Sequence, residues 1–154
     1  MSDLYESPKS IVGDVRKGNL FLAIIIGVVV DFGLTLVAGG VLGSIIGFAL
    51  LEQGIPASQL EAEIDRTLPA VMDSAMGYGF TAIGLFASFL GAFLAAKYSN
   101  HKEYTVATVL AVIALLVSWL VEDASSSALK HYTLVVLGVA VIYLGARTHV
   151  RGKL

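Results

Sequence analysis

Cysteine is absent from the chain, and charged residues are scarce. Without cysteine, neither disulfide bonds nor thiolate metal sites can contribute to the fold or to catalysis. Only 14% of the 154 residues are charged, and the lysines and arginines are not clustered as nucleic-acid binding requires. We therefore expect no nucleic-acid partner.

The motifs of common enzyme classes are also missing. The run "GGVLG" lacks the Lys-Ser/Thr pair of a phosphate-binding loop and lies in an apolar segment. His101, His131 and His149 fall in a loop or at helix ends on both sides of the predicted membrane, so they cannot converge on one metal. No Ser-His-Asp arrangement can be assembled around Ser125 to Ser127. We expect no enzyme activity, no cofactor and no metal.

What the chain does contain is apolar sequence, at 56% of residues and a mean hydropathy of +0.82. Four segments are apolar enough to cross the roughly 20-residue hydrocarbon core of a bilayer, namely residues 20–51, 75–96, 104–121 and 132–146. Residues 1–154 thus predict one all-α membrane domain, a bundle of four transmembrane helices. As one helix, the first segment would extend about 48 Å, so it must tilt, project or break, and Ala38 to Gly40 is the best candidate for a break.

Lysine and arginine set the orientation. Among the basic residues, only Arg66 and Lys130 fall outside when both termini are placed in the cytoplasm. We expect a multi-pass protein of the plasma (inner) membrane, with the lipid bilayer as its solvent. No cleavable signal peptide is predicted, because the run after the first 18 polar residues is too long.

Two stretches outside the membrane predict short amphipathic helices. In the cytoplasmic segment 1–18, Ser7 can cap a surface helix that has Pro8 at its first position. In the outer loop 52–73, Ser58 and Glu61 have the spacing of a capping box. Leu60, Ile64 and Leu68 then follow on one face. This acidic helix is either a docking site for a protein or cation, or a lid over the helix ends, and we favour the lid.

Small residues recur at the spacing that lets membrane helices approach closely. They are Gly39, Gly43 and Gly47 in the first segment, and Gly84, Ala87, Gly91 and Ala95 in the second. These stripes serve either as a dimerisation face or in packing the first two helices within one subunit. We expect at least one of them to be used within the chain.

Asp31 lies about 16 Å beyond Leu20, near the middle of the core. A central aspartate costs about 2.5 to 3.5 kcal/mol on insertion, so it must face protein or water. No lysine or arginine lies at its depth, and burial without a counter-ion favours the neutral acid. The candidate partners of this intramembrane polar site are Thr35, Thr81, Ser88 and Ser118. Asp31 is either a hydrogen-bond clamp between helices or a carrier site for transport.

Two resemblances add expectations. "GAFLAAKYSNHKEYTVATVLAVIALLV", Gly91 to Val117, resembles the second helix end, basic turn and third helix of small uncharacterised bacterial four-span membrane proteins, and implies no activity. The layout of four helices with an acid in the first is similar to the small multidrug resistance transporters, which exchange protons for cationic drugs. Here the acid is Asp31 instead of glutamate, and the outer loop is longer than in that family.

The sequence thus favours a non-enzymatic membrane subunit or assembly module that associates with itself or with other membrane proteins. The alternative is a small proton- or cation-coupled transporter with Asp31 as carrier site. No substrate is predicted.

Overall fold

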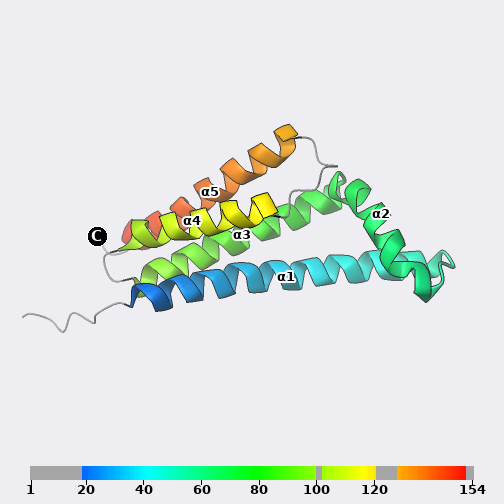
Figure 1. Ribbon diagram of the computed structural model, residues 1–154, viewed down its shortest axis with the longest axis horizontal. Coiled ribbons are helices and arrows are strands. Elements are labelled where there is room, and N and C mark those ends of the chain that lie inside the picture. The colour runs from blue at the N-terminus through cyan, green and yellow to red at the C-terminus, as the bar shows by residue number, and fades with distance from the viewer. Residues whose placement is uncertain (1–18, 100–101, 121–127, 152–154) are drawn as a thin grey trace, which may run out of the picture.

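The computed structural model describes residues 19–99, 102–120 and 128–151, which are mostly helical and contain no strand (Figure 1). The elements are α1 (Leu20–Glu52), the short 3-10 helix η1 (Ala57–Gln59), α2 (Leu60–Met72), α3 (Ala75–Tyr98), α4 (Glu103–Leu120) and α5 (Ala128–Arg151). Within this part of the chain, α1, α3, α4 and α5 are long and apolar enough to cross a membrane, which confirms the four apolar segments. The predicted helix at Ser7 and Pro8 lies outside the described residues.

Helix α1 is continuous over its 33 residues, so of the three possibilities left open for the first segment, the break at Ala38 to Gly40 does not occur. Asn19 caps its beginning by accepting hydrogen bonds from the backbone N–H groups of Phe21 and Leu22. Glycine in a helix costs about 1 kcal/mol relative to alanine, but an unpaired backbone group in hydrocarbon costs several kcal/mol. The helix therefore continues through the glycines and extends about 50 Å.

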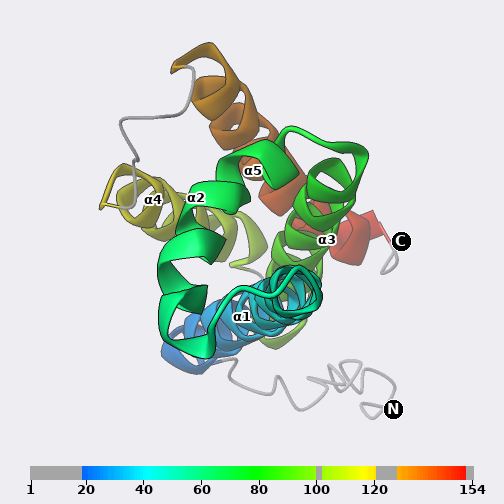
Figure 2. The ribbon, with the colours of Figure 1, turned by 90° about the vertical axis from the view of Figure 1, so that its right-hand side faces the viewer.

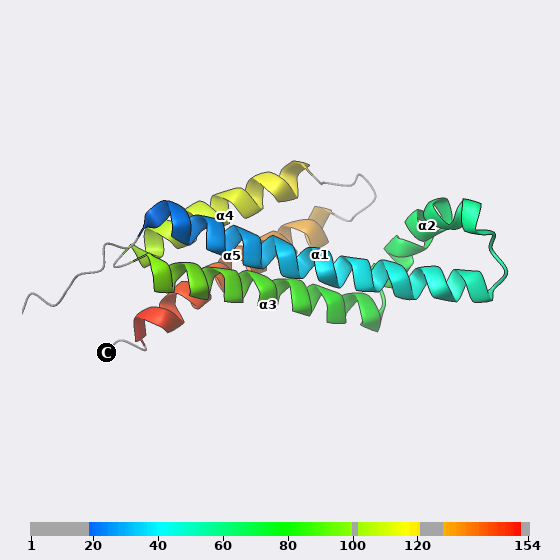
Figure 3. The ribbon, with the colours of Figure 1, turned by 90° about the horizontal axis from the view of Figure 1, so that it is seen from below.

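Helix α1 extends past the beginning of α3 (Figure 3). Gly27 contacts Gly91, and Ser88 contacts Asp31, so this antiparallel register places Ala75 level with about Gly43. The last turns of α1 are therefore not covered by α3. Helix α2 folds back along them, and its apolar side chains contact a cluster of buried α1 residues, namely Leu42, Ile46 and Leu50.

The start of α2 differs from the prediction. The chain turns first through η1, and α2 begins after Gln59, which makes no side-chain capping hydrogen bond. The capping box at Ser58 and Glu61 is therefore wrong, because the 3-10 turn holds Ser58 one position before the helix boundary. Leu60 and Ile64 nevertheless contact α1 next to Gly47.

Helix α3 contacts each of the other three long helices. Seen from the end that carries α2, here called the α2 end, α3 and α4 lie on opposite sides of the view, α1 lies below, and α5 runs obliquely (Figure 2). Helix α1 begins at the opposite end, where α5 ends (Figure 1). A core of mostly small residues closes this opposite half, with Ala23, Ala95, Ala107 and Ala146 each at most 1% exposed.

Candidate functional site

Asp31 lies where α1 contacts the middle of α3. The hydroxyl of Ser88 donates a hydrogen bond of 2.9 Å to the Asp31 carboxyl. Asp31 is half-buried and faces protein, and Ser88 lies about 20 Å along α3 from Ala75. The pair links the first two membrane-spanning candidates near the middle of α3.

Glycine makes this contact possible. A Cβ at position 91 would lie 2.7 Å from the backbone oxygen of Gly27 and 3.2 Å from the Cβ of Asp31. A Cβ at position 27 would meet Leu110 and Ala95 at 2.8 and 3.0 Å. The two backbones thus touch next to the Asp31 carboxyl, and the small-residue row of α3 (Ala87, Gly91 and Ala95) is buried inside the chain.

The other predicted partners of Asp31 do not join it. Thr35 is exposed, and the Thr81 hydroxyl donates to the carbonyl of Gly77 in its own helix. Ser118 instead lies 3.4 Å from the imidazole Nε2 of His131. A threonine in a helix commonly satisfies its hydroxyl on the preceding turn, which removes the reason for it to seek Asp31.

A cavity of about 270 Å³ lies between α3, α4 and α5. It is on the α2 side of the small-residue core around Ala23, Ala95, Ala107 and Ala146, here called the alanine core. Ser88 lines it from α3, Ser118 from α4 and His131 from α5, among apolar neighbours that include Gly138 and Ile142. His131 is near the beginning of α5, and Ile142 is about 16 Å deeper. Ser88 therefore touches the Asp31 carboxyl and also lines the cavity.

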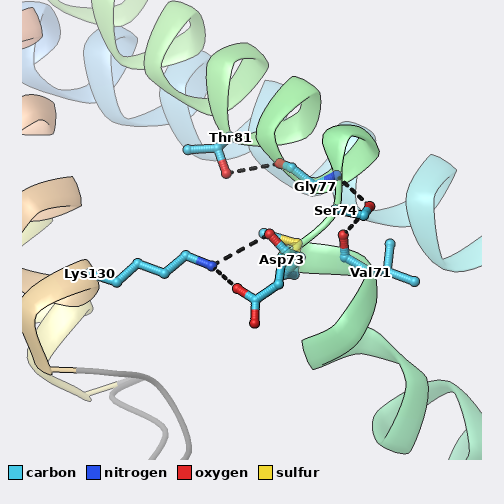
Figure 4. Close-up of polar contacts among 7 residues, drawn as sticks. Val71, Asp73, Ser74, Gly77, Thr81 and Lys130 are labelled. Carbon is cyan, nitrogen blue, oxygen red and sulfur yellow. Dashed lines mark hydrogen bonds and ion pairs between the residues drawn. The ribbon is translucent and has the colours of Figure 1, made fainter.

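The first turn of α5 stands away from α3 and is joined to it by a long side chain (Figures 1 and 4). Lys130 reaches across to form an ion pair with Asp73, between α2 and α3. Its ammonium group also lies 3.5 Å from the carbonyl oxygen of Met72 and 5.6 Å from the centre of the Tyr78 ring. The charges of Lys130 and Asp73 neutralise each other at the α2 end of the cavity.

Besides the small-residue row of α3, the chain has a row of glycines on α1. This α1 row has no neighbour in the described part of the chain. A Cβ added at Gly33, Gly39, Gly40 or Gly43 would meet no atom within 4 Å. The row continues into a groove between α1 and α2 that includes Gly47, Phe48, Leu51 and Leu60. Of the predicted α1 stripe, Gly39 and Gly43 are thus open, whereas Gly47 is covered by α2. On α3, Gly84 is open as well.

Two polar or close contacts were not predicted. Thr108 of α4 and Tyr143 of α5 lie 2.9 Å apart, and because the Thr108 hydroxyl already donates to the Tyr104 carbonyl, Tyr143 is the donor. Gly145 lets α5 approach α3 so closely that a Cβ there would lie 2.5 Å from the carbonyl oxygen of Phe89. In the sequence, this close approach of α5 could have been inferred from Gly138 and Gly145, which lie seven residues apart in the last apolar segment.

Comparisons with protein-family models, with curated protein sequences and with solved structures found no match. The two resemblances drawn from the sequence stay predictions.

Proposed function

We propose that the chain is a non-enzymatic assembly module of a membrane, which associates through the open glycine face of α1. We place it in the bacterial plasma membrane as a four-helix bundle with the α2 end outside and both termini in the cytoplasm. This orientation is supported by Lys97, Lys102 and Arg147 at the end opposite α2, because basic residues favour the cytoplasmic side.

The observation that carries the proposal is the row Gly33, Gly39, Gly40 and Gly43. Apolar side chains gain nothing from leaving lipid for one another, so membrane helices associate by close backbone approach at small residues. The α3 row shows this use within the chain, since Gly91 touches Gly27. The α1 row offers the same flat surface with no partner inside the described chain, and a second copy supplies an identical surface for a symmetric pair.

Disulfide cross-linking in native membranes tests the proposal, because the chain has no cysteine of its own. A cysteine at Gly43 is expected to form a covalent dimer on oxidation, since two copies paired at this face bring the positions within bonding range. The control is Ala49→Cys, an exposed position six residues on and on a different face of α1.

Dimer formation at Gly40→Cys and Gly43→Cys but not at Ala49→Cys supports pairing of two copies. Absence of dimer at both glycine positions contradicts it. If the chain then purifies in mild detergent with other membrane proteins, and Gly43→Leu but not Ala49→Leu releases them, the same face binds a different partner. If no dimer forms on cross-linking and the chain also purifies in mild detergent without other proteins, the assembly proposal is wrong.

A second candidate function rests on the Asp31–Ser88 pair. An acid at mid-depth that faces protein and has no cationic partner among the described residues can exchange a proton or cation when water reaches it. The chain is then a small proton- or cation-coupled transporter with Asp31 as the carrier site.

Proton movement into sealed vesicles tests this candidate, with a pH-sensitive dye trapped inside. Asp31→Asn is expected to abolish a flux that the unaltered chain supports, whereas Thr35→Val, at an exposed position without a contact to Asp31, leaves it unchanged. No flux from the unaltered chain, or the same flux after Asp31→Asn, excludes the transporter.

A further inference from the structure

We propose that the cavity between α3, α4 and α5 is a water-filled route by which protons reach the Asp31–Ser88 pair from the α2 end only. The proposal rests on the second candidate function for its purpose, but the existence of the route is tested separately.

The packing of the molecule is asymmetric about Asp31. On the side opposite α2, the alanine core brings α1, α3, α4 and α5 into direct contact, and Ala95 and Ala146 are fully buried. On the α2 side, α3, α4 and α5 line the cavity, and the beginning of α5 diverges from α3 (Figure 1). We infer that water from the α2 side reaches Ser88 through this cavity, because Ser88 is among its lining residues. The pocket at the opposite end, lined by Tyr104, Tyr143 and Arg147, does not include Ser88.

The polar groups of the cavity are placed along its length. His131 and Ser118 lie near its α2 end, and Ser88 lies about 16 Å deeper at the level of Ile142. A volume of about 270 Å³ holds several water molecules, each of which occupies roughly 30 Å³ in the liquid. Hydroxyl and imidazole groups give such water its hydrogen-bond partners, which acyl chains cannot do.

The charges around the route permit a proton to pass. His131 is the titratable group in the cavity lining, and Tyr132 contacts its ring. Lys130, next to it, is paired with Asp73, which offsets the positive charge at the α2 end. Behind Ser88, the Asp31 carboxyl accepts the Ser88 hydroxyl hydrogen bond and has no ion pair among the described residues. In the proposal, this carboxyl accepts and releases the proton.

Single cysteines on α5 test whether the cavity holds water. Val135→Cys and Gly138→Cys place a thiol in the lining, and a Cβ at position 138 meets nothing within 4 Å. Val136→Cys is the matched control, because it lies between them in depth but its side chain is 67% exposed on the outer surface of the helix. A charged, membrane-impermeant thiol reagent reacts with the thiolate, which forms in water and not in lipid.

The expected result is labelling of both cavity positions from the α2 side of sealed vesicles, at least about tenfold faster than Val136→Cys, and none from the other side. Labelling from the opposite side, or no labelling of either cavity position, overturns the proposal. Because two positions are used, misfolding of one variant does not decide the outcome. If labelling occurs but Asp31→Asn leaves proton movement unchanged, the route exists and the transporter candidate fails.

Discussion

At position 91, hydrogen is the only side chain that fits the observed helix contact. The Gly27 carbonyl oxygen lies 2.7 Å from the place where a Cβ would be, and a backbone atom cannot rotate away as a side chain can. The Asp31–Ser88 bond one turn away depends on this short distance between α1 and α3. A single methyl group at this position therefore acts on packing and on the polar pair together.

We expect Gly91→Ala to destabilise the protein by about 1–3 kcal/mol, because overpacking a close contact forces the two backbones apart. Gly84→Ala is the control on the same helix, since a Cβ there meets nothing within 4 Å and alanine favours the helix by up to about 1 kcal/mol. Unfolding of the detergent-solubilised protein, followed by circular dichroism, measures both. Equal stability of the two variants would show that α1 and α3 do not touch at position 91.

Among the elements, α2 covers the part of α1 that is too long for the hydrocarbon core. A helix of about 50 Å exceeds a hydrocarbon core of about 30 Å, and α1 stays apolar to Leu51. Helix α2 returns along its last turns and covers Leu42, Ile46 and Leu50, which would otherwise face water or headgroups. The acidic side chains Glu61 and Asp65 remain exposed on the far side of α2.

Ile64→Asp is expected to release α2 from α1, because it places a charge against the apolar cluster. Trypsin added at the α2 side of sealed vesicles should then cleave after Arg66, which is exposed, roughly ten times faster than in the unaltered chain. Ala62→Asp, on the exposed side of α2, should leave the rate unchanged. Equal cleavage of the two variants contradicts the docking of α2.

For the whole molecule, the distribution of basic residues predicts which end lies in the cytoplasm. Lys102 lies at the end opposite α2, and Ser58 lies at the α2 end. In intact cells, an impermeant thiol reagent is expected to label Ser58→Cys and to label Lys102→Cys only after the membrane is opened. The reverse pattern would invert the proposed orientation and with it the side from which the cavity is reached.

Sequence alone determined the class of this protein and the positions of its long helices. The lengths of the apolar segments are enough to predict these helices, because a backbone in lipid must satisfy its hydrogen bonds within each helix. The same rule explains why α1 is continuous through Ala38 to Gly40, the place where a break was left open. The end of α5 was placed five residues early, since its last turns are polar.

The tertiary structure alone decided which small and polar residues meet. Ser88 could be named as one of four candidate partners of Asp31, but only the register of α1 against α3 selects it. In the same structure, Ser118 lies next to His131 instead of Asp31. Likewise, the glycine rows of α1 and α3 look equivalent in sequence, yet Gly91 is enclosed and Gly43 is open. Spacing along one helix defines a face, whereas the neighbour that covers the face depends on the rotation and register of another helix, which no local pattern contains.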